Sequence, residues 1–236
     1  MNLKTKSFLT LCVISLSSVS FASEVNADSN GLSPYLPGLT AKVGTLGAGL
    51  DLTIPVMPDN INARVGVSGF RYSYDVDISS TSIGADLTIF NVSLLADYHP
   101  FQGGFRITAG GVYNGNKLDV SGRPNGTINF NGIDYAVADV GHVDAKVDFM
   151  PIAPYFGLGW GNAANKDSSF HFAFDIGAIY QGTPNVTMNA SCGSVLPAAQ
   201  CSTLRASANA EAEVIEDNLK FFKFYPVVQL GVSYSF

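Results

Sequence analysis

The chain lacks the features of a nucleic-acid ligand, a helical membrane protein or a metalloenzyme. It has 13 lysines and arginines against 19 aspartates and glutamates, and an acidic chain is a poor partner for phosphate backbones. After the N-terminal segment no uninterrupted apolar run reaches the roughly 18 residues of a spanning helix, so helical spans are excluded. A serine-nucleophile motif, paired metal ligands and a phosphate-binding loop are also missing. We therefore expect no enzyme, no metal site, no cofactor and no nucleic-acid partner.

Cysteine is scarce, with three residues in the whole chain. Cys12 lies in the N-terminal apolar run, behind a bulky Leu11 that does not fit a lipoprotein signal. Cys192 and Cys201 remain, with eight residues between them. An oxidising periplasm would let these two form a disulfide, and the alternative is a pair of unpaired loop thiols.

The N-terminus has the pattern of a secretory signal peptide. Lys4 and Lys6 precede an apolar run over residues 8–16, and small residues follow at Ser20 and Ala22. This run is shorter than the roughly 20 apolar residues that cross a bilayer as a helix. We expect cleavage after Ala22.

Three parts of the chain follow from that cleavage site. Residues 1–22 are expected to be a signal peptide, 23–38 a periplasmic segment and 39–236 a single barrel domain. Removing 1–22 takes two of the 13 cationic residues and none of the 19 acidic ones, so the mature net charge is 11 − 19 = −8.

The C-terminal segment alternates strictly between two faces. Counting by twos from Phe222, one face is apolar or aromatic and the other becomes polar and small, as pleating between lipid and lumen requires. The ending resembles the assembly signal of outer-membrane barrels, carried by Gln229, Gly231, Tyr234 and Phe236. The alternative is an edge strand of a soluble sheet that happens to end in phenylalanine.

Eight alternating segments separated by Gly, Pro, Asn and Asp predict an all-β, eight-stranded antiparallel transmembrane barrel. They cover about 39–45, 49–56, 61–77, 83–99, 105–120, 145–161, 170–181 and 222–236. The apolar phase changes near Gly69, which predicts a β-bulge there. Residues 123–143 read as a polar loop. The connection 184–217 includes a stretch over 204–215 that predicts a short amphipathic helix.

A soluble lipocalin-like barrel is the main alternative fold. It would point its aromatic residues inward and its charges outward, whereas most mid-strand charges here lie opposite the aromatic face. The exceptions are Asp86, Lys146 and Asp148, near the expected outer ends of strands. Connections that alternate between short and long also agree with a membrane barrel whose termini are both periplasmic.

Eight strands enclose a lumen that side chains can fill, so an open diffusion pore is not expected. The inferred lumen charges are Lys42, Arg64, Asp97, Arg106 and Asp175, with Tyr155, His171 and Gln181 as further lining. Because an unpaired buried charge is costly, these charges should pair, and Asp97 with Arg106 is the easiest pair. The cluster is then either a gate for zwitterions or a plug that holds the barrel in register.

Catalysis has weak support. His171 and Asp175 lie four residues apart on one strand face, about 13 Å, which is too far for a hydrogen bond. Asp97 and His99 lie two apart. A site assembled from separate strands, and a surface-binding role for the loops after Arg123 and Pro184, stay open as alternatives.

The chain resembles the carbapenem susceptibility-associated outer-membrane proteins of Acinetobacter and relatives. The resemblance is carried by Ala153-Pro154-Tyr155 with Gly157 and Gly159, by the run from Tyr180 to Val186, and by the acidic run before Phe222. It implies an eight-stranded barrel that admits small solutes, such as basic amino acids, and carbapenems. The loop cysteines depart from the family pattern, which weakens the transfer of substrate.

We therefore expect a monomeric barrel of a Gram-negative cell outer membrane that allows restricted passage of small polar or zwitterionic solutes. Its expected partners are outer-membrane lipid, lipopolysaccharide and, during insertion, the barrel assembly machinery. The alternative is a barrel with a structural or loop-mediated binding role and no transport.

Overall fold

The computed structural model describes residues 37–57, 60–78, 81–123, 127–130, 132–136, 140–164, 169–193 and 197–236. The expected signal peptide (1–22) and nearly all of the expected periplasmic segment (23–38) lie outside these residues. Among the described residues, no helix is both long enough and apolar enough to cross a membrane.

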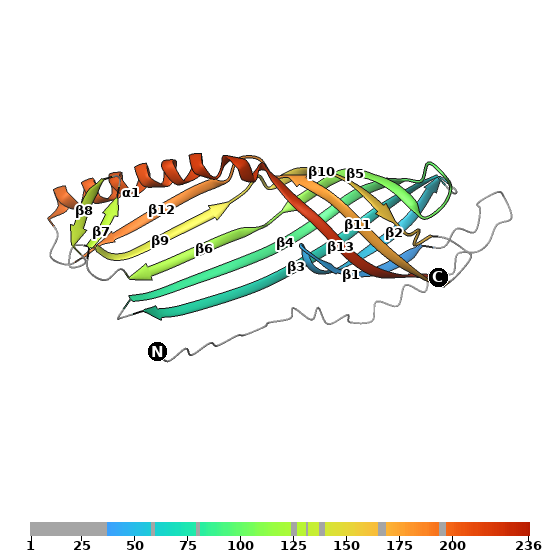
Figure 1. The fold of residues 1–236 in the computed structure, drawn as a ribbon, viewed down its shortest axis with the longest axis horizontal. Helices are drawn as coiled ribbons and strands as arrows, with labels where there is room; N and C mark the ends of the chain where they lie inside the picture. Colours follow the sequence, from blue (N-terminus) through green and yellow to red (C-terminus); the bar gives the residue numbers. More distant parts are fainter. Residues whose placement is uncertain are drawn as a thin grey trace.

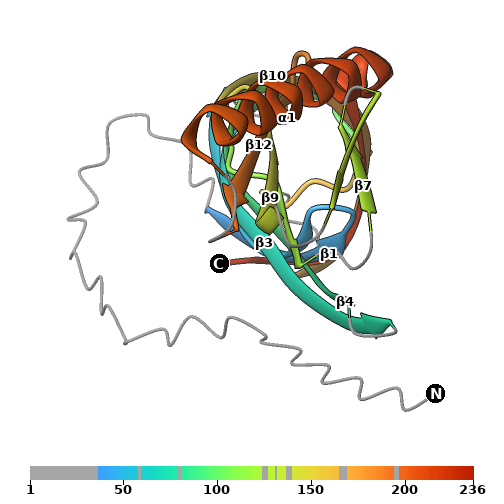
Figure 2. The same cartoon turned by 90° about the vertical axis from the view of Figure 1, so that its left-hand side faces the viewer.

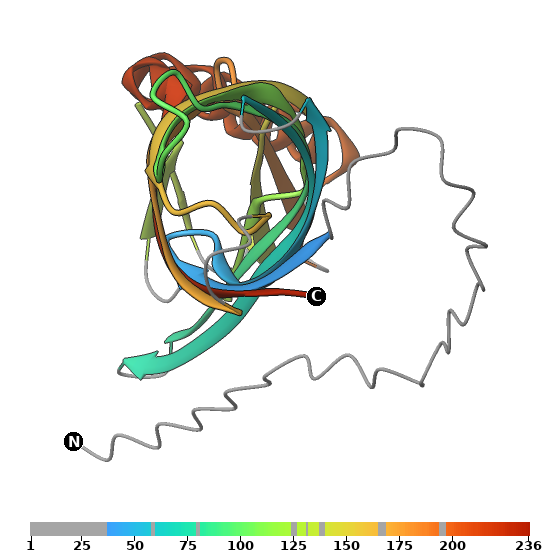
Figure 3. The same ribbon diagram turned by 90° about the vertical axis from the view of Figure 1, so that its right-hand side faces the viewer.

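Eight antiparallel strands form a closed barrel, which Figure 3 shows end-on. In order around the ring they are β1 (Gly38–Gly44), β2 (Gly47–Met57), β3 (Ile61–Ile78), β4 (Thr81–Tyr98), β5 (Phe105–Asn114), β10 (Ile152–Trp160), β11 (Phe170–Tyr180) and β13 (Phe224–Ser235). Pairing of β1 with β13 closes the ring, so no strand edge of the barrel is left unpaired. A lipid environment demands this, because hydrocarbon satisfies no backbone hydrogen bonds. The expected all-β fold is confirmed.

The outer surface of the barrel is apolar because apolar and polar side chains alternate along its strands. Along β13 every second side chain from Phe224 to Phe236 is exposed, whereas Val227, Gln229 and Ser233 between them are buried. Period-two pleating places these two sets on opposite sides of the wall. A surface of this kind is stable in hydrocarbon and would aggregate in water.

Outside the barrel, β3 and β4 continue into a second sheet, here called the outer sheet (Figure 1). Its strand order is β3, β4, β6 (Lys117–Arg123), β9 (Val140–Asp148) and β12 (Asn185–Cys192). Only the far halves of β3 and β4 take part, because β4 pairs with β5 up to Asn91 and with β6 from Thr88 outward.

Two of the strands expected from the sequence are each divided into two strands, one in the barrel and one in the outer sheet. The segment expected over 145–161 is two strands, since β9 ends at Asp148 and β10 begins at Ile152. Pro151 lies in the break, and proline cannot donate to a sheet ladder. The segment expected over 105–120 is likewise divided between β5 and β6.

The bulge expected near Gly69 is wrong. The register between β3 and β4 runs without a shift from Ile61 opposite Tyr98 to Ile78 opposite Thr81. Phe70, Tyr72 and Tyr74 therefore continue the same face as Arg64. The apolar phase changes because this face lines a lumen of charges inside the barrel and becomes the apolar face of the outer sheet beyond it.

The two long connections hold regular structure. The loop expected over 123–143 contains the hairpin of β7 (Thr127–Phe130) and β8 (Ile133–Ala136). The helix expected over 204–215 is longer, forming α1 (Ala198–Asn218), and a short 3-10 turn η1 (Lys220–Lys223) leads into β13.

Helix α1 runs along one side of the outer sheet (Figure 1 and Figure 2) and packs on β12. Leu204 and Ala208 of the helix are buried against Ala190 of that strand. A disulfide between Cys192 and Cys201 joins the end of β12 to the first turn of α1. The helix is thus held on the sheet by both a covalent bond and a small apolar cluster.

Replacing Cys201 and Cys192 with serine is expected to loosen α1 and leave the barrel intact. The disulfide closes a loop of about ten residues, for which chain entropy gives a stabilisation of roughly 2–3 kcal/mol. Limited proteolysis should then cut within α1 while the barrel keeps its heat-modifiable migration in gels. Unchanged protease resistance of α1 would show that packing alone holds the helix.

Candidate functional site

The barrel lumen contains six charged side chains, here called the ion network, and each comes from a different strand. In order around the ring they are Lys42 (β1), Asp51 (β2), Arg64 (β3), Asp97 (β4), Arg106 (β5) and Asp175 (β11). The signs alternate around the wall, and three cations face three carboxylates. Each charge therefore has an opposite charge on a nearby strand, and the network is neutral as a whole.

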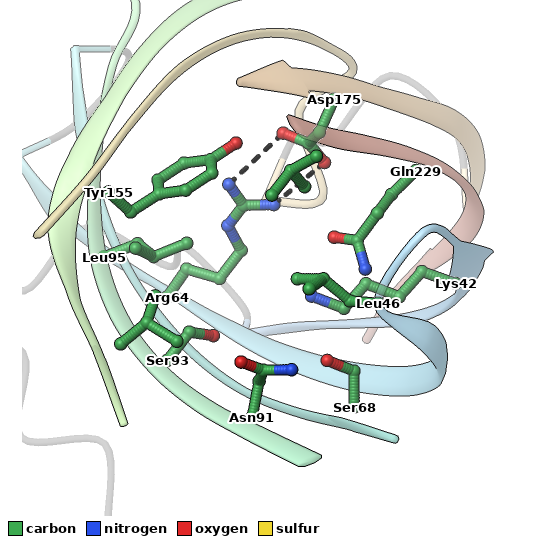
Figure 4. A pocket seen from close by; sticks show the side chains of 12 residues that line it. Lys42, Leu46, Arg64, Ser68, Asn91, Ser93, Leu95, Tyr155, Asp175 and Gln229 are labelled. Atoms are coloured by element: carbon green, nitrogen blue, oxygen red, sulfur yellow. Dashed lines mark hydrogen bonds and ion pairs between the residues drawn. The ribbon is translucent and has the colours of Figure 1, made fainter. Parts of the chain in front are cut away.

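Arg64 is the centre of the network. Its Nη1 lies 3.1 Å from an Asp175 oxygen and 3.4 Å from Asp51, and its Nη2 lies 3.0 Å from Asp97. The side chain is 5% exposed, so these carboxylates replace the water that a guanidinium would otherwise hold. Figure 4 shows Arg64 reaching across the lumen to Asp175. One arginine thus ties three separate strands to β3.

The other two cations complete the network. Arg106 donates from Nη2 to Asp175 at 2.8 Å and also donates to the carbonyl of Gly161. Its Nε lies 3.8 Å from Asp97, so the expected Asp97–Arg106 pair exists but is the longer of its two ion pairs. Lys42 lies 2.6 Å from Asp51.

Two glycines leave the space that the network occupies. Gly159 of β10 lies directly opposite Arg106 on one side and Asp175 on the other. A Cβ added there would lie 2.7 Å from Arg106 Nε and 2.8 Å from Asp175, so the missing side chain lets the two charges meet across β10. At Gly66 an added Cβ would collide with Asp51.

An apolar layer covers the outer side of the ion network. Its buried members are Leu46, Leu95, Val112, Ala153, Tyr155, Ile179 and Val227. Leu46 comes from the tight turn between β1 and β2, and Tyr225 fixes this turn by donating to the Thr45 carbonyl at 2.6 Å. A solute entering from outside therefore meets apolar side chains before it meets charge.

The periplasmic side of the network is polar instead. Asn62 donates to the Asn162 side chain at 3.1 Å and lies 3.2 Å from a ring nitrogen of His99. On the same side, Thr40 and Ser233 share a hydrogen bond of 2.7 Å. The periplasmic zone of the lumen is thus polar, whereas the outer zone combines the apolar layer with the buried polar side chains of Ser68, Asn91, Ser93 and Gln229.

The free space in the lumen is small. One cavity of about 20 Å³ lies beside the apolar layer, and another of about 10 Å³ lies on the polar side. Arg64 lines both of them. A water needs about 10–15 Å³ of this kind of space, so each cavity has room for about one water.

The sequence located most of this site but not all of it. The five inferred lumen charges all face the interior, and Tyr155 lies in the apolar layer. Asp51 was missed, although alternation with the outward-facing Leu50 and Leu52 would have placed it inside.

Two residues expected to line the lumen lie away from the network. Gln181 follows the last residue of β11 at its outer end and donates to the carbonyl of Phe222 at 2.9 Å. His171 is half-buried near the periplasmic start of β11 and lines neither lumen cavity. Both were placed by strand parity alone, which gives the face of a side chain and not its depth.

The residues expected to form the assembly signal divide between the two faces of β13. Gln229 and Gly231 turn inward, and Tyr234 and Phe236 turn outward with their ring centroids 5.2 Å apart. Their role in insertion stays a prediction.

Of the two acid–histidine pairs considered in the sequence, the structure shows the hydrogen-bond contacts of His99. The ring nitrogens of His99 contact the carbonyl of Gly103, at 2.9 Å, and the Asn62 amide, so neither of these contacts is to Asp97. Within the described part of the chain, no group of three or more metal-ligating side chains is found.

The three charges that do not follow the inward pattern, Asp86, Lys146 and Asp148, belong to the outer sheet, and their side chains are partly exposed. Arg71 and Asp86 lie 3.8 Å apart on its polar face. Lys146 lies 2.8 Å from Asp148, and its hydrogen bond lowers the pKa of the Asp148 carboxyl. These exposed pairs supply controls for the buried network.

Arg64→Ala is expected to destabilise the barrel strongly. It leaves Asp51, Asp97 and Asp175 with two cations between them, and breaking a buried network in this way costs about 3–5 kcal/mol. Arg71→Ala, which removes an exposed arginine, should cost less than about 1 kcal/mol. Urea unfolding in detergent, followed by tryptophan fluorescence, measures both. Equal losses in the two variants would contradict a stabilising role for the network.

Comparison with solved structures agrees with the barrel fold and with a location in the outer membrane. The crystal structure of Acinetobacter baumannii CarO matches with a TM-score of 0.55 and 26% sequence identity, over 87% of this chain and 100% of CarO. CarO2 of the same organism matches with a TM-score of 0.53 and 23% identity, over 85% of this chain and 98% of CarO2, and at that identity it supports the fold alone.

No family model matches the chain, and no curated protein matches it. The closed eight-stranded ring, the apolar outer surface and the likeness to CarO lead to one conclusion: the chain is an eight-stranded outer-membrane β-barrel that is similar to CarO.

Proposed function

We propose that this barrel allows slow, selective passage of small zwitterionic solutes, such as amino acids, across the outer membrane. The observation that carries the proposal is the alternating, charge-balanced ion network, which blocks the lumen at the level of Arg64. Any solute that passes must take the place of contacts within this network.

A zwitterion matches the network better than other small solutes. Its carboxylate can take the place of Asp97 or Asp175 at an arginine while its ammonium pairs with the carboxylate released. A solute with a single charge would leave one buried charge uncompensated, and a neutral solute would compensate none.

The network also has unused hydrogen-bond donors. Within the described residues, the Nε atoms of Arg64 and Arg106 are buried and have no hydrogen-bond partner. A solute carboxylate is an acceptor with the charge and size to bind them. Two such donors at the level where the lumen is blocked support the choice of solute.

Size restricts the proposal to molecules no larger than an amino acid. The lumen cavities measure about 20 and 10 Å³, and a carbapenem is far larger than either. Passage of even an amino acid requires the ion pairs to open transiently. We therefore leave carbapenems out of the proposal.

Neutralising one ion pair of the network should open the barrier. The double variant Asp97→Asn with Arg106→Gln keeps the lumen neutral and removes two of its buried charges. We expect liposomes with this variant to swell several-fold faster in both glycine and a small neutral sugar, and to lose the preference for glycine shown by the unaltered protein.

The matched control is Lys117→Gln with Asp119→Asn, which removes an exposed pair of β6 from the outer sheet and leaves the net charge unchanged. Its swelling rates should equal those of the unaltered protein. If the lumen variant also swells at the unaltered rate while staying folded, the network is not a gate.

The second candidate is a closed membrane anchor that presents the outer sheet and α1 to the surroundings of the cell. Two observations favour it: the lumen is filled, and five strands and a helix lie outside the ring. A barrel that never conducts in the swelling assay, with or without the lumen charges, would support this role.

A further inference from the structure

The outer sheet has an open strand edge that the barrel does not have. Strand β3 pairs with β2 only as far as Gly69, opposite Ala48, whereas its pairing with β4 continues to Ile78. Among the described residues no strand pairs with the other edge of β3 over 70–78. Figure 1 shows this segment at the margin of the outer sheet. Its unpaired backbone groups form a template for another strand.

This edge carries few of the features by which proteins prevent edge pairing. From Phe70 to Ile78 it contains neither proline nor glycine, and its register with β4 has no bulge. Edge strands are usually short, bulged, interrupted by proline or covered. A nine-residue regular edge is long enough to accept a partner strand.

The apolar face of the segment is regular as well. The rings of Phe70, Tyr72 and Tyr74 form a row with neighbouring centroids 6.4 Å apart and ring planes within 7° and 14° of parallel. They remain 40%, 37% and 43% exposed. Aromatic rings of this kind favour cross-strand contact with other aromatic side chains.

The polar face of the same segment is self-complementary in charge. Arg71 and Asp75 lie two residues on either side of Ser73. In an antiparallel pairing of two identical strands centred on Ser73, Arg71 of each strand lies opposite Asp75 of the other. Tyr72 lies opposite Tyr74, and Phe70 opposite Val76. The existing partner of Arg71, Asp86, is 3.8 Å away and exposed, so it leaves the guanidinium accessible.

We propose that the open edge of β3 binds the same edge of a second copy of this chain, with residues 70–76 of one copy paired to residues 70–76 of the other. The pairing is antiparallel and centred on Ser73, and it joins the two outer sheets into one. It adds a homotypic contact to the protein and does not depend on solute passage.

The direction of the strands determines where the second copy lies. Strand β3 runs outward from the barrel, so copies in one membrane all send residues 70–78 away from that membrane. Two such strands cannot run antiparallel side by side. The antiparallel pairing therefore joins copies held in two facing membranes, and many weak contacts across the gap add up through avidity.

Charge reversal tests the pairing directly. Vesicles that carry the full-length protein should cluster, as measured by light scattering. Arg71→Asp places two aspartates opposite each other, and Asp75→Arg places two arginines opposite each other. We expect vesicles of each variant alone to cluster at most about one tenth as fast as vesicles of the unaltered protein, because avidity multiplies the loss of affinity at each contact. Mixing vesicles of the two variants should restore clustering, since an edge with two acidic residues then faces an edge with two basic ones.

Matched controls separate edge pairing from general charge attraction. Lys117→Asp and Asp119→Lys make the same changes in net charge at an exposed pair of β6, a strand paired on both sides. Vesicles of either control variant should cluster alone as the unaltered protein does. Heat-modifiable migration in gels shows that each variant is folded.

A cross-link gives a second measurement. With Ser73→Cys, two copies should form a disulfide-linked dimer, because residue 73 faces itself across the twofold axis. Ser121→Cys on β6 should not. The proposal is overturned if unaltered vesicles do not cluster, if the edge and control variants behave alike, or if mixing the two edge variants restores nothing.

Discussion

The rest of the structure depends on the mutual neutralisation of six charges inside a narrow ring. Eight strands enclose a space that holds side chains and little else. A charge in that space loses its water, so it persists only beside an opposite charge. Alternation of sign around the wall gives Lys42, Asp51, Arg64, Asp97, Arg106 and Asp175 such partners. Gly66 and Gly159 are glycines for a related reason, because a side chain at either position would occupy the space that the charged groups need.

The lengths of two strands explain the second half of the molecule. Strands β3 and β4 have 18 residues each, whereas β1 has 7 and β2 has 11. Beyond Gly69 their barrel neighbours stop, and β6, β9 and β12 take over on one side only. The face that held charges in the lumen then becomes apolar, because α1 packs against part of it. The hairpin of β3 and β4 thus belongs to two sheets, and the same face of it is charged in the barrel and apolar in the outer sheet.

The sequence predicted what depends on neighbouring residues along the chain. The alternation from Phe224 to Phe236 gives the two faces of β13 directly, and it also gives the inward side of Lys42, Arg64 and Asp97. It could not give partners that lie far apart in sequence. No residue near Val147 indicates that β9 pairs with β6 and β12 instead of joining the barrel. Near Gly69, a change in the environment of one strand face gives the same sequence pattern as a β-bulge. The depth of Gln181 along the barrel axis depends in the same way on distant strands.

The turn that carries Leu46 has a further consequence for bare ions. Leu46 is 6% exposed and lies between the outside and the ion network, together with the other members of the apolar layer. Bare inorganic ions would have to shed their hydration in this layer before they could reach any compensating charge. Dehydration in this layer and compensation by the network would thus come one after the other along the same path, so the barrel opposes a bare ion at two separate levels.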